Sequence, residues 1–331
     1  MGEYDKLEEF RKEWLSDTDF IVARTSGSTG TPKEIHLLKD KMKESARRTI
    51  RFFGLNGSSY LYSCVSCAFV GGKMMAVRSW ELGCRFGFEE PGIIPLEGKE
   101  FARDEKIDLI SVVPSQMLSL IQRPEVCSHV SRFLIGGAPV SLSLRRAIVE
   151  AGVEAWESYG MTETCSHVAL RRVSVPQMPF HPLPGVEVEF DERNCLVIMV
   201  DGDSFVTNDI AELTSGGGFS ILGRYDNVII TGGKKLNPEL IEKKLEEWLS
   251  RHYGLTDGNY AISSLPDEKW GDKCVLVVEG EAEIPCIRAL KESGILQNWE
   301  YPKEIIRLRS FPVTPNGKLD RAGLRRLLKT L

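Results

Sequence analysis

Apolar residues follow two spacings that alternate along the first half of the chain. Short apolar runs predict buried strands at residues 20–23, 60–65, 108–113 and 133–135. Between these runs, apolar residues three or four positions apart predict helices, among them an amphipathic helix over residues 4–16. Strands that alternate with helices in this way are typical of a largely parallel sheet with helices on its faces. We therefore expect an α/β fold.

The second half of the chain has a different pattern. Beyond residue 185, apolar side chains occupy alternate positions, which predicts antiparallel β structure that ends at Thr207-Asn208-Asp209. Asn237 and Pro238 suit the N-cap and first residue of a helix. Apolar runs at residues 275–278 and 305–308 predict further strands.

The composition is that of an ordinary globular protein, which limits the classes of partner. The 331 residues, 42% of them hydrophobic, suffice for one substantial core and allow about two domains. A net charge of −5, from 47 acidic and 42 basic residues, gives no broad positive field, so we expect no nucleic acid partner. No apolar run approaches the roughly 18 residues of a membrane helix, and the first 20 residues are too charged for a signal peptide. We expect a cytoplasmic protein with no membrane partner.

The cysteines do not indicate a disulfide scaffold, because eight in a chain of this length are too few. Only Cys64 and Cys67 form a C-x-x-C pair, and no second pair accompanies it as a zinc site would require. We interpret both as buried, reduced thiols in an apolar strand. Metal ligation or redox work is the alternative.

A run rich in hydroxyl groups and glycine occupies residues 25–33. It reads Thr25, Ser26, Gly27, Ser28, Thr29, Gly30, Thr31, Pro32 and Lys33. Glycine permits close backbone approach, hydroxyls and N–H groups can donate to phosphate oxygens, and lysine supplies charge, so we predict a triphosphate-binding loop. It is not a Walker A loop, in which lysine directly follows the second glycine. The alternative is a surface linker of the same composition.

Glycine turns follow predicted strands at their carboxyl ends, where ligands bind in α/β sheets. The turn Gly136-Gly137-Ala138-Pro139 follows one strand, and Tyr159-Gly160-Met161-Thr162-Glu163 contains an aromatic-glycine turn followed by an acid. Lys73 follows two glycines at the start of an apolar helix. We expect Lys73 either to extend to the surface or to meet a substrate carboxylate.

Together these segments resemble the adenylate-forming superfamily of acyl-CoA synthetases, firefly luciferase and peptide-synthetase adenylation domains. Six segments correspond in order: residues 25–33, 136–139, 159–163, Asp209, residues 223–226 and residues 312–318. Read singly, Glu163 could be a helix-cap acid, Asp209 a turn residue, Arg224 an ion-pair partner and Lys318 a solvated lysine. Six matching segments in the same order are specific to this superfamily. The resemblance implies a large domain over residues 1–225, with a helix-flanked sheet and an antiparallel β region, and a small mobile α+β lid over residues 226–331 hinged at Asp226.

The resemblance also implies two half reactions. A carboxylate attacks the α-phosphate of ATP to give an acyl-adenylate and pyrophosphate, and a thiol, usually that of coenzyme A, then displaces AMP. The implied ATP-binding residues are the phosphate loop (Thr25, Ser26, Gly27, Ser28, Thr29, Gly30, Thr31, Lys33), the adenine frame (Gly137, Ala138, Pro139, Tyr159, Gly160) and the ribose pair (Asp209, Arg224). Thr162 would reach the α-phosphate, Glu163 would bind Mg²⁺, and Lys318 would bridge the substrate carboxylate and the α-phosphate. Gly232 and Gly233 would line the pantetheine path.

Two features depart from the superfamily pattern. The phosphate loop starts only 25 residues into the chain, so we expect a shortened large domain that lacks part of the usual sheet. Residues 69–75, which include Lys73, replace the usual aromatic or histidine motif. With the stretch at residues 230–239, this makes the chain most similar to the o-succinylbenzoate-CoA ligases of menaquinone synthesis. Lys73 would then help to bind the second carboxylate of the substrate.

The resemblance therefore points to an acid–CoA ligase whose partners are a small carboxylic acid, ATP, Mg²⁺ and CoA. One alternative is an adenylating enzyme that loads another aryl or acyl acid onto CoA or a carrier protein. Another is a catalytically inactive nucleotide-binding homologue, against which the intact Glu163 and Lys318 argue. The sequence leaves open whether the protein is a homodimer.

Overall fold

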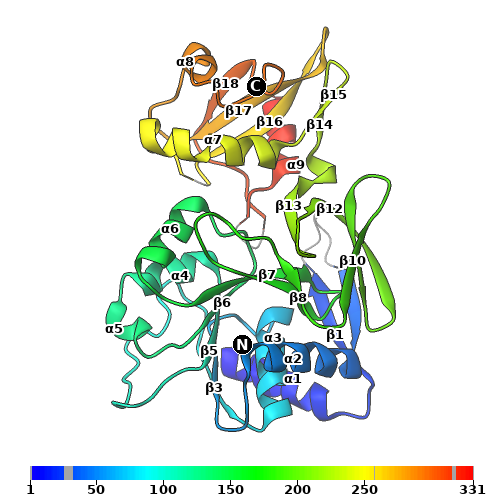
Figure 1. Cartoon of the computed structure of the whole chain (residues 1–331), viewed down its shortest axis with the longest axis vertical. Coiled ribbons are helices and arrows are strands. Elements are labelled where there is room, and N and C mark those ends of the chain that lie inside the picture. The colour runs from blue at the N-terminus through cyan, green and yellow to red at the C-terminus, as the bar shows by residue number, and fades with distance from the viewer. Residues whose placement is uncertain (1, 26–32, 257, 315–317, 331) are drawn as a thin grey trace. The chain divides into compact units, whose positions relative to one another are not determined.

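The computed structural model describes residues 2–25, 33–256, 258–314 and 318–330 (Figure 1). The chain divides into two compact units. The first unit comprises Met1–Glu189, Ile198–Phe205 and Thr214–Phe219, and the second comprises Phe190–Val197, Val206–Leu213 and Ser220–Leu331. Because the two units interleave, the boundary and hinge predicted at Asp226 stay predictions.

The first unit is built on a seven-stranded sheet of order β4-β3-β5-β6-β7-β8-β9. Five strands run parallel: β3 (Tyr60–Ser63), β4 (Arg85–Phe88), β5 (Leu109–Val112), β6 (Phe133–Ile135) and β7 (Ala155–Met161). Two antiparallel strands, β8 (Ser166–Arg172) and β9 (His181–Pro182), complete it. The predicted largely parallel α/β sheet is confirmed. Since parallel strands end at one edge, the segments after β3, β5, β6 and β7 share that edge of the sheet.

Helices follow these strands as the apolar spacing predicts. They are α3 (Val70–Leu82), α4 (Pro114–Ile121), the short α5 (Pro124–Cys127) and α6 (Leu142–Glu150). The hydroxyl of Ser141 caps α6 by accepting from the Leu144 N–H. The core beneath α4 and α6 consists of strand residues such as Ile110, Phe133 and Ile135, all fully buried.

The chain begins with α1 (Glu3–Leu15), the hairpin strands β1 (Phe20–Thr25) and β2 (Lys33–Leu38), and α2 (Lys39–Phe53). Figure 1 shows α1, α2 and α3 close together in the first unit. Strand β2 was not predicted, because the polar Glu34 and His36 alternate with only two apolar residues. The pairing of β1 with β2 places Thr25 opposite Lys33.

A four-stranded sheet of order β10-β11-β12-β13 draws its residues from both units. Its strands are β10 (Val186–Phe190), β11 (Cys195–Val200), β12 (Asp203–Leu213) and β13 (Phe219–Arg224). The antiparallel prediction is confirmed, but the expected end at residues 207–209 was wrong. Polar residues do not stop β12 because Thr207 and Ala211 continue its buried face.

The second unit contains a five-stranded sheet. Four of its strands lie in the order β15-β14-β17-β16, and β18 pairs in parallel with β17. A single 3₁₀ turn (Tyr225–Asn227) precedes it. Its elements are β14 (Ile229–Thr231), β15 (Lys234–Leu236), α7 (Pro238–Tyr253), β16 (Tyr260–Asp267), β17 (Gly271–Glu279), α8 (Ile287–Glu292), β18 (Glu304–Leu308) and α9 (Arg321–Leu328). Alternate residues of β17 face opposite cores, Leu276 toward α7 and Val277 toward α9. The Asn237 cap and the α7 helix are confirmed.

In the described part of the chain, no helix is both long and apolar enough to cross a membrane. All eight cysteines are free thiols, and Cys64 and Cys67 are buried, as expected. They lie just after β3 rather than within it. Burial raises the pKa of Cys67 to about 12, with the Glu3 carboxylate adding to the effect, so this thiol is unreactive at neutral pH.

Candidate active site

The turn between β7 and β8 carries Thr162 and Glu163 at the carboxyl edge of the first unit's sheet. Thr164 ties the turn, since its hydroxyl accepts from the Met161 N–H at 3.1 Å and lies 2.8 Å from the Ser166 carbonyl. Cys165 and Ser166 hold positive φ values of 52° and 85°, a backbone conformation that side chains rarely adopt. The turn is therefore tightly constrained, and it leaves the Glu163 carboxylate exposed.

The donor set at this turn fits a magnesium ion held jointly with ATP. Among the described residues, no group of three or more histidine, cysteine or acidic side chains could hold a metal alone. Magnesium in nucleotide enzymes typically takes one or two carboxylates, phosphate oxygens and water. Glu163 supplies one exposed carboxylate at the predicted place, so its role as the Mg²⁺ ligand stays a prediction that the structure allows.

Tyr159 and Gly160 do not form a turn, contrary to expectation. Both lie in β7, where the pairing with β8 shifts between them. A Cβ on Gly160 would collide with the Ser166 carbonyl, so glycine lets the two strands approach closely at this shift. The Tyr159 ring packs against Phe180 and Phe219, with centroids 5.6 and 5.3 Å away.

The turn at residues 136–139 is held by a buried ion pair that the sequence analysis missed. The Glu157 carboxylate accepts from the Val140 N–H at 3.1 Å and pairs with Arg171 at 2.7 Å. Arg171 also lies 4.0 Å from the centroid of the Phe180 ring. Glu157 and Arg171 face each other across β7 and β8, so opposite charges at facing strand positions were the available signal. The pair fixes the turn containing Gly137, Ala138 and Pro139 to the strand that carries Tyr159.

The phosphate loop is only partly covered by the structure. Thr25 is the last residue of β1 and Lys33 is the first residue of β2, and the two positions are paired in the hairpin. The remaining predicted phosphate-binding residues, Ser26, Gly27, Ser28, Thr29, Gly30 and Thr31, lie outside the described residues. Their assignment stays a prediction.

In the second unit, Asp209 and Arg224 form an ion pair, and their binding of the ribose stays a prediction. The Arg224 guanidinium donates to Asp209 at 3.1 Å and to Asp226 at 3.0 Å. Burial opposes its charge, but Asp209 and Asp226 outweigh burial and raise the pKa of Arg224. Asn208 donates to both oxygens of Asp226 at 3.1 Å, which orients that carboxylate.

Lys318 lies near this cluster in the second unit. Its backbone N–H donates to the Thr314 hydroxyl at 3.2 Å, and its carbonyl accepts from the Thr314 N–H at 2.7 Å. Although Lys318 is exposed, desolvation by neighbouring atoms and then the Arg224 charge lower the pKa of its ammonium. Gly232 and Gly233 form the exposed turn between β14 and β15, with φ values of 52° and 76°.

Two cations of α3 are buried in the first unit. Lys73 is 9% exposed, and its ammonium lies 4.2 Å from the centroid of the Phe10 ring. The expectation that it extends to the surface was therefore wrong, because α1 covers it; its role toward a carboxylate stays a prediction. Arg78, which the sequence analysis missed, is 1% exposed, and its Nε and Nη2 have no hydrogen-bond partner among the described residues. Burial alone lowers the pKa of Arg78 to about 9.

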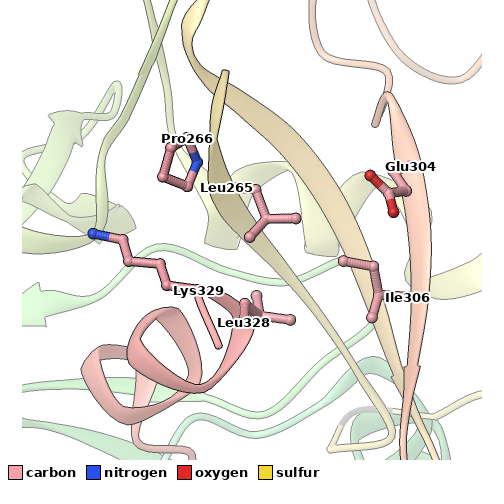
Figure 2. A pocket seen from close by; sticks show the side chains of 6 residues that line it. All are labelled: Leu265, Pro266, Glu304, Ile306, Leu328 and Lys329. Atoms are coloured by element: carbon pink, nitrogen blue, oxygen red, sulfur yellow. The ribbon is translucent and has the colours of Figure 1, made fainter. Parts of the chain in front are cut away.

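A hollow of about 450 Å³ lies in the second unit and shares no residue with the predicted site. It is lined by Leu265, Pro266, Glu304, Ile306, Leu328 and Lys329 (Figure 2). The apolar side chains of Leu265 and Leu328 lie between the two charged ones. Because Glu304 already pairs with Lys273 at 2.7 Å, the hollow offers no free acid for chemistry.

Comparison with known proteins places the chain in a family. The sequence pattern of the AMP-binding enzyme family matches residues 6–203. The protein is similar to the 2-succinylbenzoate–CoA ligase of Enterococcus faecalis, with 24% identity over 94% of this chain and 70% of that one. The chain belongs to the AMP-binding enzymes.

Solved structures share the fold. An acyl-CoA synthetase (AMP-forming)/AMP-acid ligase II-like protein from Dyadobacter fermentans is 32% identical, with a TM-score of 0.62 over 98% of this chain and 94% of that one. The o-succinylbenzoate coenzyme A synthetase of Bacillus subtilis, in complex with ATP and magnesium ion, is 20% identical. Its TM-score is 0.77, and the match covers 91% of this chain and 68% of that one. The mixed α/β fold of adenylate-forming enzymes is thus confirmed.

Proposed function

We propose that this AMP-binding enzyme is an ATP-dependent acid–CoA ligase that works through an acyl-adenylate. The observation that carries the proposal is the cluster of Asp209, Arg224 and Lys318, which the fold assembles from segments far apart in the sequence. A protein that only bound a nucleotide would need the ribose-binding pair Asp209 and Arg224, but it would not need Lys318. The name of the Enterococcus faecalis relative supports CoA as the thiol.

The first half reaction needs charge neutralisation and alignment more than covalent help. A carboxylate oxygen of the acid bonds to the α-phosphorus of ATP, and the bond from that phosphorus to the bridging oxygen breaks to release pyrophosphate. Negative groups must approach one another in this step, so fixed cations and hydrogen-bond donors lower the barrier. We assign these tasks to the loop at residues 25–33, to Thr162 and to Lys318.

Bound Mg²⁺ would neutralise phosphate charge, and Glu163 would hold it. The constrained turn at residues 161–166 would keep Thr162 and Glu163 in place without reorganisation during the reaction. Asp209 would accept from the ribose hydroxyls, while Arg224 donates. In the second half reaction the CoA sulfur bonds to the acyl carbon and AMP leaves, with Gly232 and Gly233 along the path of the pantetheine arm.

The acid is proposed to be o-succinylbenzoate, also called 2-succinylbenzoate, in menaquinone biosynthesis. The names of the relatives support this choice. The substrate keeps one free carboxylate after adenylation, and a buried cation is a suitable partner for it. Helix α3 supplies two candidates, Lys73 and Arg78, and Arg78 has nitrogens without a partner in the described structure.

A panel of carboxylic acids, scored by pyrophosphate release with CoA present, tests the proposal. We expect o-succinylbenzoate to give the highest kcat/KM and the thioester to form with free CoA. If pyrophosphate release depends on the acid but a thioester forms only with a carrier protein, the result would favour an adenylating enzyme that loads a carrier protein. Nucleotide binding without any acid-dependent pyrophosphate release would favour the inactive homologue.

Replacing Lys73 with methionine is expected to raise the KM for o-succinylbenzoate about tenfold and to leave the KM for ATP unchanged. Methionine keeps the packing on Phe10 but removes the charge, and one charge-assisted hydrogen bond contributes about 1.5–3 kcal/mol. Lys43→Met, at a partly exposed position of α2, is the matched control. An unchanged KM would exclude Lys73, and the same assay on Arg78→Met would then test the second cation.

A further inference from the structure

The N-terminus of α1 is tied to the loop that follows β3 by one buried carboxylate. Glu3 is 2% exposed. It accepts from the Ser66 hydroxyl at 2.8 Å, from the Cys67 N–H and from the Lys6 ammonium at 3.1 Å. A buried carboxylate is costly unless its oxygens are satisfied, so these contacts hold α1 and the loop at residues 64–69 together.

This loop lies at the carboxyl edge of the sheet. It starts directly after β3, the Cys64 N–H donates to the Ser111 carbonyl at 3.0 Å, and the Gln116 amide donates to the Cys64 carbonyl at 2.9 Å. The loop therefore joins the ends of β3 and β5 to the start of α4. Ligands of parallel α/β sheets bind along this edge.

The position of this loop determines the position of the first turn of α3. A Cβ on Gly72 would collide with the Ser66 carbonyl, so loop and helix lie in direct backbone contact. Any shift of Ser66 must move Gly72 or open a gap beside it. Lys73 is the next residue, so its location depends on the same contact.

Aromatic residues of α1 also pack on α3. The Phe10 ring lies 4.2 Å from the Lys73 ammonium and 5.2 Å from the centroid of Trp80, and Trp14 lies 5.9 Å from Trp80. Phe10 is 1% exposed. The aromatic contacts fix the body of α1 on α3, and the Glu3 carboxylate fixes its first turn on the loop by buried side-chain hydrogen bonds.

We propose that Glu3 is a positioning residue for the acid substrate: through Ser66 and Cys67 it sets the place of the loop and of the first turn of α3, which form one wall of the acid site. The inference rests on the proposed function. Glu3 lies just before residues 6–203, which the family pattern matches. The nucleotide residues lie on other elements, so Glu3 should affect the acid and not ATP.

The test compares Glu3→Ala with Glu3→Gln in the full-length protein, by steady-state pyrophosphate release with o-succinylbenzoate. Alanine removes both acceptor oxygens, and we expect the acid KM to rise about tenfold while the ATP KM stays within about twofold. Glutamine keeps an acceptor for the Cys67 N–H and can donate to the Ser66 hydroxyl, so it should restore most of the acid affinity. Glu8→Ala, at a partly exposed position of α1, is the matched control.

Ser66→Ala is the second variant, and it keeps the test decisive where Glu3→Ala fails to fold. It should raise the acid KM about threefold, and the double variant Glu3→Ala/Ser66→Ala should be no worse than Glu3→Ala alone. Folded variants with unchanged acid KM, or with acid and ATP KM raised alike, would overturn the inference while leaving the proposed function intact. A wild-type protein that releases pyrophosphate with no acid of the panel would overturn both.

Discussion

Replacing Lys318 with alanine is expected to reduce acid-dependent pyrophosphate release by about 10²- to 10³-fold, the usual loss when one preorganised charge-stabilising donor is removed. The same variant should still convert a supplied acyl-adenylate and CoA into thioester, because no phosphate-to-carboxylate approach occurs in that step. Lys318 is exposed, so its truncation is expected to change the free energy of unfolding by less than about 0.5 kcal/mol. Separate assays of the two half reactions measure the difference.

Lys329→Ala is the matched control, since Lys329 is another exposed lysine of the second unit and lines the hollow of Figure 2 rather than the predicted site. It should leave both half reactions unchanged. An equal loss of both half reactions in Lys318→Ala would contradict the assignment, and so would full retention of pyrophosphate release.

The pH dependence of the first half reaction should report the Lys318 ammonium. Desolvation and the Arg224 charge lower the pKa of Lys318. Its charge, and with it the rate, is therefore expected to be lost as pH rises through a value below the ordinary lysine pKa of about 10.4. In Lys318→Arg the cation persists above pH 12, so whatever activity remains should lack this alkaline decline. A decline at the same pH in both proteins would assign it to another group.

Local patterns predicted most of the elements that build the site. The runs before Pro114 and Gly136 are apolar and short because both faces of a central parallel strand are covered, and β5 and β6 are buried throughout. Asn237 caps α7 through its own side chain, a contact within three residues that sequence alone can specify. Predictions of this kind depend on neighbours along the chain, which is why they were confirmed.

The burial of charged residues could not be predicted in the same way. Lys73 and Arg78 look like the polar positions of an ordinary helix, but both α1 and α2 pack on α3. Two partners of the Glu3 carboxylate, Ser66 and Cys67, lie more than sixty positions away along the chain. Whether a residue is exposed depends on which distant segment packs against it. A single sequence does not show which segment that is.

The paired charges of Glu157 and Arg171 were missed for a related reason. Each residue alone looks like a polar position of a half-buried strand, and only the register of β7 on β8 places them opposite each other. The register was not predictable because Gly160 was taken as part of a turn, and the shift in pairing falls there. Strand pairing, rather than strand existence, was the missing information.

Glu157→Ala is expected to lower the free energy of unfolding by about 3–5 kcal/mol, the usual cost of leaving one charge of a buried pair without its partner. The side chains of Arg171 and Glu157 are 9% and 4% exposed, so water cannot replace the lost carboxylate. Burial already lowers the pKa of Arg171, and Glu157 opposes that shift, so its removal would lower the pKa further. Urea unfolding measures the change, with Glu247→Ala at the exposed pair on α7 as control. A loss below about 1 kcal/mol would contradict the prediction.

The double variant Glu157→Met/Arg171→Met separates stability from function at this pair. Two apolar side chains of similar volume leave no buried charge, so most of the lost stability should return. The Val140 N–H would still lack its acceptor, and the turn at residues 136–139 would lose the bond that ties it to β7. We therefore expect a near-normal free energy of unfolding together with an ATP KM raised about tenfold. A normal ATP KM in that variant would show that the turn holds its place without Glu157, and the ion pair would then serve stability alone.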